Sequence, residues 1–164
     1  MQRAVEVWEL VQAAQAGERA AFDQLATLYR PGVYAVCLDR TRDFDVAQDL
    51  TQQALIKAYA GLHELREARA FPQWLRQIAL NCCRSWMRRP APRLLRLEAA
   101  EQLPAWDAET VARRHLAREI AAALAQLHEN SRLAFLMHVQ GSSYREIADF
   151  IGAPETTVKV AKSI

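Results

Sequence analysis

The chain has 164 residues, of which 51% are hydrophobic and 24% are charged, and its net charge is +2. This length and apolar content allow one domain or two small ones with a real core, and they exclude a disordered tail. The longest apolar runs are only a few residues long, and the first residues lack the apolar core of a signal peptide. We therefore expect no membrane span and no secretory leader, and predict a cytoplasmic protein.

The pattern of residue types predicts an all-α fold. Glycine is sparse, and no stretch alternates β-branched and polar residues with a period of two. Expected helices cover about residues 5–16, 18–41 with a break at Pro31-Gly32, 45–62, 70–89, 107–127, 130–140, 144–150 and 155 onward. Residues 90–106 begin with Pro-Ala-Pro and lack a helical period, which predicts a flexible linker. The sequence thus predicts two small helical domains, residues 1–89 and 107–164.

In the third expected helix, apolar residues follow one face and a mixed face lies beside it. The apolar positions are Val46, Leu50, Ala54 and Ala58. The mixed face holds Asp49, Gln52, Gln53 and Ile56. A stripe that combines polar and apolar groups suits a protein partner, although a solvated face would look the same.

The fourth expected helix, residues 70–89, also has two distinct faces. Its predicted core positions are Leu75, Ile78, Ala79, Cys82 and Trp86. Its polar stripe consists of Gln73, Gln77, Asn81, Arg84 and Arg88. Amide and guanidinium groups bond to base edges and phosphates, so this stripe can bind nucleic acid. Phe71 and Trp74 at the helix start can stack on unpaired bases, although aromatic side chains in that place more often belong to the core.

Positive charge is concentrated around the same helix. Eight arginines and one acid, Glu67, lie between Arg66 and Arg96, a net charge of +7 that leaves −5 for the rest of the chain. Such a basic segment is what a phosphate backbone attracts. A solvated helical face explains the same charges equally well.

Residues 142–160 have the pattern of a helix-turn-helix. Ser143 and Glu146 form a capping box that starts the first helix, and Gly152 supplies the left-handed conformation that ends it. Pro154 opens the second helix, and Ala148 allows the two helices to approach closely. The second helix of such a unit enters the major groove of DNA.

No catalytic or metal-binding pattern accompanies these segments. Cys37, Cys82 and Cys83 lack the spacing of a zinc site, so we predict reduced thiols, two of them in the core. The histidines are scattered, and we find no glycine-rich phosphate loop, no nucleophile elbow and no site of paired carboxylates. The sequence predicts a protein without a metal or another cofactor that is not an enzyme.

Three segments in order, residues 45–59, 71–81 and the helix-turn-helix, resemble the bacterial RNA polymerase sigma factors of the extracytoplasmic-function (ECF) group. The resemblance covers about residues 21–160. It implies a protein that gives core RNA polymerase its promoter specificity. The implied partners are promoter DNA, an anti-sigma factor, and core polymerase through its β′ clamp helices and β flap.

The resemblance also implies a role for each segment. The polymerase-binding residues would be Asp49, Gln52, Gln53 and Ile56. Residues 62–89 would melt the −10 element and hold its non-template strand, with a flipped base near residues 65–71. The −10 residues would be Arg66, Arg69, Phe71, Trp74, Gln77, Asn81, Arg84 and Arg88. The linker would thread toward the polymerase active-site cleft. The −35 residues would be Glu155, Thr156, Thr157 and Lys159.

Two departures from the family pattern bear on these roles. The second helix of the helix-turn-helix is followed only by residues 161–164, so we expect a weak contact with the −35 element. The polymerase-binding segment holds fewer acids than is usual, so we expect docking to depend more on hydrogen bonds and on Ile56. Two alternatives stay open at this point: a free-standing helix-turn-helix regulator, and a sigma-like decoy that binds an anti-sigma protein.

Overall fold

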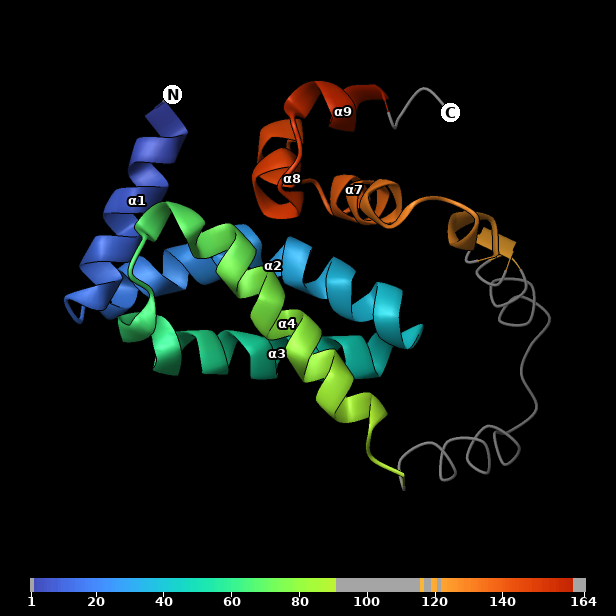
Figure 1. The fold of residues 1–164 in the computed structure, drawn as a ribbon, viewed down its shortest axis with the longest axis horizontal. Coiled ribbons are helices and arrows are strands. Elements are labelled where there is room, and N and C mark those ends of the chain that lie inside the picture. Colours follow the sequence, from blue (N-terminus) through green and yellow to red (C-terminus); the bar gives the residue numbers. More distant parts are fainter. Residues whose placement is uncertain (1, 91–115, 117–118, 121, 161–164) are drawn as a thin grey trace.

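The computed structural model describes residues 2–90, 116, 119–120 and 122–160, and in this part of the chain every regular element is helical (Figure 1). The long helices are α1 (Gln2–Gln15), α2 (Arg19–Thr41), α3 (Phe44–Gly61), α4 (Phe71–Met87) and α7 (Glu129–Val139). The short helices are η1 (Leu62–Glu64), η2 (Ala68–Ala70), α8 (Tyr144–Ile151) and α9 (Glu155–Val160). The predicted all-α class is confirmed. The expected linker beyond Pro90, with Arg93 and Arg96, lies outside the described residues.

Helices α1 to α4 form the first unit. α2 packs along α3, and α4 lies across both of them (Figure 1). The largest fully buried side chains of this unit include Leu25, Val33, Val36, Phe71 and Leu75. Burying each such aliphatic or aromatic side chain contributes roughly 1.5–3 kcal/mol.

Helix α4 has the core face that its periodicity predicts. Leu75, Ala79 and Cys82 are buried, while Ile78 and Trp86 are half-buried and pack against the same core. Cys83 is also buried, and so is Cys37 of α2. All three thiols are therefore free and lie in the core, whereas the sequence predicted only two of them there.

Helix α2 runs unbroken through Pro31, so the predicted break at Pro31-Gly32 is wrong. Proline inside a helix removes one backbone hydrogen bond and costs on the order of 3 kcal/mol. The residues that follow it, Gly32 and Val33, are buried between neighbouring helices. Tertiary packing on both sides of Pro31 offsets the local cost and keeps the helix continuous.

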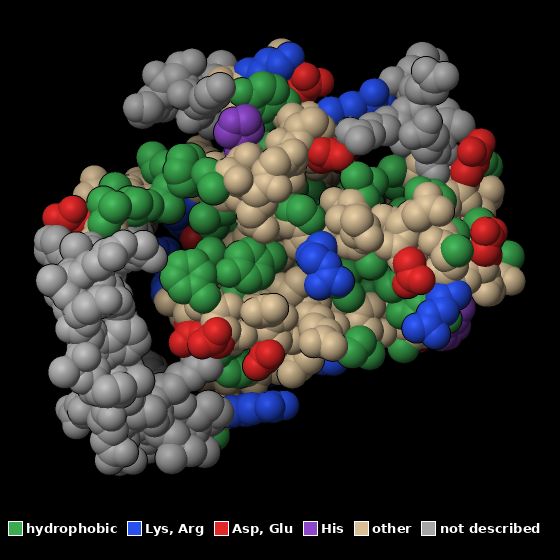
Figure 2. Space-filling view, turned by 180° about the vertical axis from the view of Figure 1, so that it is seen from behind, with side chains coloured by type: hydrophobic (Ala, Val, Ile, Leu, Met, Phe, Trp, Pro, Cys, Tyr) green, Lys and Arg blue, Asp and Glu red, His purple; other side chains and the backbone are tan. Residues whose placement is uncertain are grey.

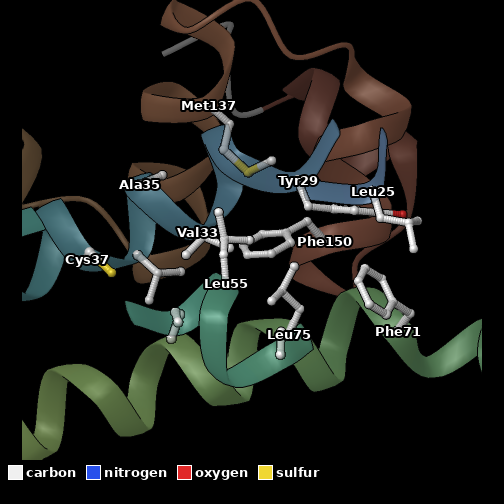
Figure 3. Close-up of a cluster of buried hydrophobic side chains, with 14 of the residues drawn as sticks. Leu25, Tyr29, Val33, Ala35, Cys37, Leu55, Phe71, Leu75, Met137 and Phe150 are labelled. Carbon is white, nitrogen blue, oxygen red and sulfur yellow. The ribbon is translucent and has the colours of Figure 1, made fainter. Parts of the chain in front are cut away.

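Helices α7 to α9 form the second unit, and it packs directly against the first. α7 contacts α2, and α8 contacts α2 and α4. Phe150 of α8 is fully buried in the same cluster as Tyr29 and Val33 of α2 (Figure 3). The two units share one hydrophobic core, a contact that the sequence did not predict.

One face of the molecule carries side chains of mixed character. On the face opposite to that of Figure 1, acidic, basic and apolar side chains are interspersed (Figure 2). Among the described residues, no three His, Cys, Asp or Glu side chains are grouped as a metal site would need. None of the helices within the described ranges has the length and apolar character required to span a membrane.

Candidate nucleic-acid and polymerase interfaces

The mixed face of α3 is open to solvent. Asp43 caps the helix by accepting a hydrogen bond from Val46 N at 2.9 Å. The inward residues are Val46, Ala47, Leu50, Thr51, Ala54, Leu55 and Ala58. The predicted polymerase-binding residues are all exposed: Asp49, Gln52, Gln53 and Ile56. They lie three or four residues apart and so share one face of the helix.

One further residue extends this face and was missed by the sequence analysis. Tyr59 follows Ile56 by three residues, and both are exposed, by 49% and 60% respectively. The Tyr59 ring is held edge-on against Phe22, with the ring centroids 4.9 Å apart. The face therefore ends in two neighbouring apolar side chains, and the spacing of Tyr59 from Ile56 was the signal that could have identified it.

The polar stripe on α4 is arranged before any ligand binds. Asn81 Oδ1 accepts hydrogen bonds from Gln77 Nε2 at 3.1 Å and from Arg84 Nη1 at 3.0 Å. These three side chains and Arg88 are exposed. The two bonds reduce the conformational freedom that the side chains would lose on binding, and they leave other guanidinium N–H groups of Arg84 available for phosphate.

The loop before α4 adds positive charge. Arg66 and Arg69, on either side of Ala68, are exposed. Leu65 and Ala68 are buried and anchor the loop, while Gln15 Nε2 of α1 donates to the carbonyl oxygens of Leu62 at 3.0 Å and Leu65 at 2.7 Å. A loop fixed in this way holds both arginines beside the start of α4.

The two aromatic residues at the start of α4, Phe71 and Trp74, are exposed to different extents. Phe71 is 1% exposed, and its ring packs against Tyr29 at 5.4 Å and Trp74 at 5.9 Å. Phe71 is therefore a core residue, and its buried ring is not open to stacking by a base. Trp74 is half-buried and keeps part of its surface exposed.

The helix-turn-helix has the local chemistry that the sequence predicts. Ser143 N donates to Glu146 Oε2 at 2.7 Å, and Ser143 Oγ accepts from Glu146 N at 3.3 Å, which completes the capping box. Gly152 ends α8 with a positive φ of 70°. Phe150, Ile151 and Val158 are buried beneath the turn.

The predicted −35 residues lie together on α9. Glu155, Thr156, Thr157 and Lys159 are all exposed. Lys159 Nζ donates to Glu155 Oε1 at 2.8 Å, and this hydrogen bond lowers the pKa of Glu155. Lys159 is the one cation among these four residues, and its charge is already paired with Glu155. Residues 161–164 lie outside the described part of the chain.

Two residues of α4, Gln73 and Arg76, form hydrogen bonds with the second unit. Gln73 Nε2 donates to the carbonyl oxygens of Asp149 at 2.9 Å and Phe150 at 3.0 Å. Arg76 donates to Ile151 O at 3.4 Å and to Glu129 Oε1 at 3.2 Å. Gln73 was predicted as part of the nucleic-acid stripe, whereas here its amide is committed to α8.

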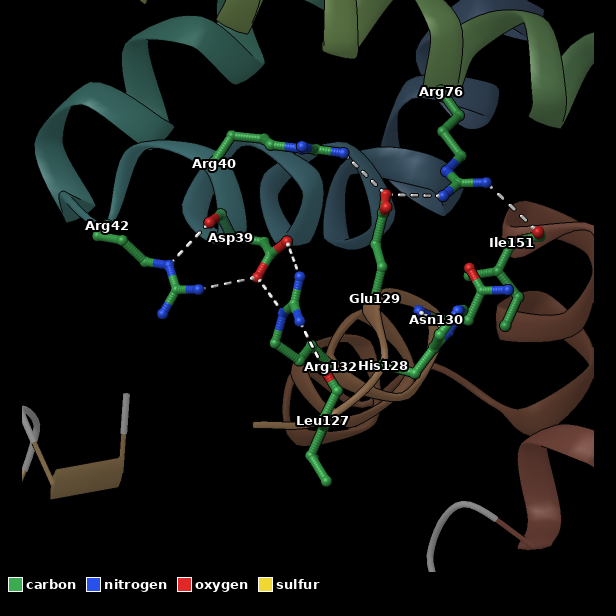
Figure 4. A network of polar contacts seen from close by, with 10 residues as sticks. All are labelled: Asp39, Arg40, Arg42, Arg76, Leu127, His128, Glu129, Asn130, Arg132 and Ile151. Carbon is green, nitrogen blue, oxygen red and sulfur yellow. Dashed lines mark hydrogen bonds and ion pairs between the residues drawn. The ribbon is translucent and has the colours of Figure 1, made fainter. Parts of the chain in front are cut away.

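Ion pairs continue this contact between the units (Figure 4). Glu129, in the first turn of α7, also accepts from Arg40 at 3.0 Å. Asp39 of α2 is 9% exposed, and its two carboxylate oxygens accept from Arg132 at 2.7 and 3.2 Å. The hydrogen bonds with Asp39 raise the pKa of Arg132.

Comparison with known proteins places both units in one family. Residues 25–92 match the family Sigma-70 region 2, and residues 117–163 match Sigma-70, region 4. The RNA polymerase sigma-H factor of Pseudomonas aeruginosa is 34% identical over 164 residues, with coverage of 92% of this chain and 85% of the relative. The ECF RNA polymerase sigma factor SigM of Mycobacterium tuberculosis is 32% identical over 156 residues, with coverage of 92% and 76%.

Other similarities are more limited. The chain spans 38% of the length of the probable RNA polymerase sigma factor RfaY of Xanthomonas campestris, with 30% identity over 156 residues. The solved structure of CnrH in complex with the cytosolic domain of CnrY shares the fold at a TM-score of 0.54 and 21% identity, covering 96% of this chain and 90% of that one. A match to region 2 as well as region 4 argues against a free-standing helix-turn-helix regulator. The chain belongs to the RNA polymerase sigma factors of the ECF group.

Proposed function

We propose that this chain directs core RNA polymerase to promoters, with the α3 face as its polymerase-binding surface. Asp49, Gln52, Gln53 and Ile56 would contact the β′ clamp helices. The exposed Ile56 and Tyr59 support this assignment, because apolar and aromatic side chains at the centre of an interface contribute most to affinity. The second unit would contact the β flap.

The −10 element would be bound by α4 and the loop before it. Gln77, Asn81, Arg84 and Arg88 form an exposed polar stripe, with Arg66 and Arg69 beside it. The observation that carries the proposal is the hydrogen-bonded Gln77-Asn81-Arg84 row on a basic helix, because it offers donors for phosphate next to amide groups for bases. Trp74 is the aromatic residue left to stack on an unpaired base.

The −35 element would be bound by α9. Thr156 and Thr157 are exposed at the start of the helix and can reach base edges or phosphates. Lys159 would have to break its ion pair with Glu155 before it could bind a phosphate. This competition supports a weak contact with the −35 element. Residues 1–89 would therefore be the polymerase-docking and −10 domain, residues 90–106 the linker, and residues 107–164 the −35 domain.

The remaining roles follow from the same assignment. The protein would act as a specificity subunit and not as an enzyme, and it would work in the cytoplasm, where its polymerase is. An anti-sigma factor would hold it inactive by covering its two DNA-binding units. A flexible linker would permit that protein to wrap both of them.

Run-off transcription tests the function. Purified core polymerase should start transcripts at specific sites on a library of genomic fragments when this chain is added, and the starts should be lost with Arg84→Glu. Core binding should survive in Arg84→Glu, because its position lies on α4 and not on α3. No specific transcript from the full chain, combined with tight binding to an anti-sigma protein, would favour the decoy alternative.

A further inference from the structure

We propose that Gln15 is a positioning residue for the −10 element: its side-chain amide sets where Arg66 and Arg69 lie before DNA binds. The inference rests on the −10 role proposed for α4 and the loop before it. It makes α1, which carries none of the polymerase or promoter contacts proposed above, a part of the single-strand site. Residues 62–70, which join α3 to α4 through η1 and η2, are called the arginine loop below.

The arginine loop buries every third residue. Leu62, Leu65 and Ala68 are buried, and the exposed Arg66 and Arg69 each follow one of these anchors. The anchors direct the arginines away from the core. The loop is otherwise built from two three-residue 3-10 helices, whose hydrogen-bond geometry is poorer than that of an α-helix. The position of its backbone therefore depends on contacts outside the loop.

The end of α1 supplies such a contact. α1 lies beside η1 and η2 (Figure 1). Gln15 Nε2 donates to Leu62 O at 3.0 Å and to Leu65 O at 2.7 Å. Both partners are acceptors, so only the amide nitrogen, which carries two protons, can satisfy them. One side chain thus joins the carbonyl groups at the two ends of η1, and it uses both of its donor protons to do so.

The backbone that carries Gln15 is itself fixed. Ala14 is buried and holds this turn of α1 against the core. Gly17 follows the helix with a φ of 100°, and its N–H donates to Ala14 O at 3.1 Å. Glu18 N donates to Ala13 O at 3.0 Å. These two bonds form a Schellman motif, so the amide of Gln15 extends from a capped helix end.

The position of the arginine loop decides whether one strand can meet both the arginines and Trp74. A Cβ at Gly61 would lie 3.6 Å from the Trp74 ring, so the loop begins beside the aromatic residue that is left to stack on a base. A base on Trp74 and a phosphate on Arg66 or Arg69 then belong to one short stretch of strand. Displacement of the loop would move the phosphate contact and leave the stacking contact in place.

A loop that is ordered in advance strengthens binding. A strand that binds a mobile loop must order it, and the apparent dissociation constant rises as the binding-ready fraction falls. One net hydrogen bond changes an equilibrium constant by a factor of about five. Loss of the Gln15 amide should therefore weaken strand binding by about fivefold.

Gln15→Met is the decisive variant. Methionine is an unbranched side chain with a similar helix propensity, but it donates no hydrogen bond. Gln15 is exposed, so the substitution should leave the core intact. Gln12→Met is the matched control, because Gln12 is an exposed glutamine about one turn earlier on α1 and belongs to none of the proposed interfaces.

Hydrogen exchange on the free chain tests the contact itself. The amides of Leu65 and Ala70 donate within the arginine loop, at 3.2 and 3.0 Å. Gln15→Met should speed exchange at these two amides and leave the amides of α4 unchanged, while Gln12→Met should match the wild type. Wild-type protection of both loop amides in Gln15→Met would overturn the proposal, because the amide would then not hold the loop.

A double-mutant cycle tests the function. Fluorescence anisotropy with the full chain and a random-sequence single strand of about 12 nucleotides measures affinity, which Gln15→Met should lower by about fivefold. Arg69→Gln should cost a smaller factor in the Gln15→Met background than in the wild type, because the loop no longer holds Arg69 in place. Arg88→Gln, at the other end of α4, should cost the same factor in both backgrounds. A general loss of structure would not separate the two arginines in this way.

Each other result overturns the positioning role in a distinguishable way. Faster loop exchange with unchanged affinity means that binding does not need an ordered loop, while the −10 assignment stands. Weaker binding with the same cost of Arg69→Gln in both backgrounds means that Gln15 does not act through the arginine. Failure of the wild type to bind the strand removes the −10 role, and the positioning role with it.

Discussion

The ring of Phe150 lies directly on the backbone of Gly32, at a distance that leaves no room for a Cβ. The two residues come from different units, so the packing of one helix-turn-helix side chain depends on a glycine in the middle of α2. This contact links the stability of the second unit to its position on the first.

Phe150→Ala should destabilise the protein by about 3–5 kcal/mol, because it leaves a cavity where a fully buried ring had been. Urea unfolding followed by circular dichroism measures the loss. The exposed aromatic Phe135, on α7, supplies the control: Phe135→Ala should change stability by less than about 1 kcal/mol. Equal losses in both variants would contradict the buried position of Phe150.

Ser143→Ala should lower the stability of the second unit by about 1 kcal/mol, since it removes the side chain that caps α8. Ser85→Ala, at an exposed position inside α4, should be neutral or slightly stabilising because alanine favours helix interiors. Amide hydrogen exchange should show the Ser143→Ala effect concentrated in α8 and α9. An effect spread evenly over α1 to α4 would count against a local cap.

Ile56→Ala should weaken binding to core polymerase by about tenfold, the size expected for a central apolar contact. Biolayer interferometry with immobilised core enzyme measures this change. Gln24→Ala, an exposed position on α2, is the control and should bind like the wild type. Wild-type affinity of Ile56→Ala would remove the α3 face from the polymerase interface.

Arg84→Gln should weaken binding to single-stranded DNA and reduce the salt dependence of that binding. Each lost phosphate contact lowers the slope of log K against log salt concentration by about 0.7 for a single strand. Titrations at several salt concentrations test this, with Arg19→Gln at the exposed start of α2 as the control. An unchanged slope for Arg84→Gln would mean that Arg84 does not contact phosphate.

The three thiols should be unreactive in the folded protein. Cys37, Cys82 and Cys83 are buried, and burial raises the pKa of Cys82. The hydrogen bond with Cys83, together with burial, raises the pKa of Cys37. The same hydrogen bond lowers the pKa of Cys83, but this thiol is only 1% exposed and is out of reach of a reagent. Because the thiolate is the reactive form, Ellman's reagent should label none of the three quickly until guanidinium unfolds the chain. Fast labelling of the native protein would show that the core opens readily.

Features that depend on neighbours in sequence were predictable. The capping box of Ser143 and Glu146 and the left-handed Gly152 are made by residues a few positions apart, so the motif alone located the helix-turn-helix. The core face of α4 and the exposed face of α3 follow from helical periodicity in the same way. The order of these segments was enough to identify the family.

Features that depend on distant residues were not predictable. Local propensity predicts a break at Pro31, whereas burial on both sides keeps α2 continuous. Phe71 is in the core because Tyr29 and Trp74 surround it. Sequence by itself determined the helices, their apolar faces and the family, since these are local and periodic properties. Only the tertiary structure decided that Gln73 binds α8 and that Phe150 rests on Gly32, because side-chain partners across two units are set by packing.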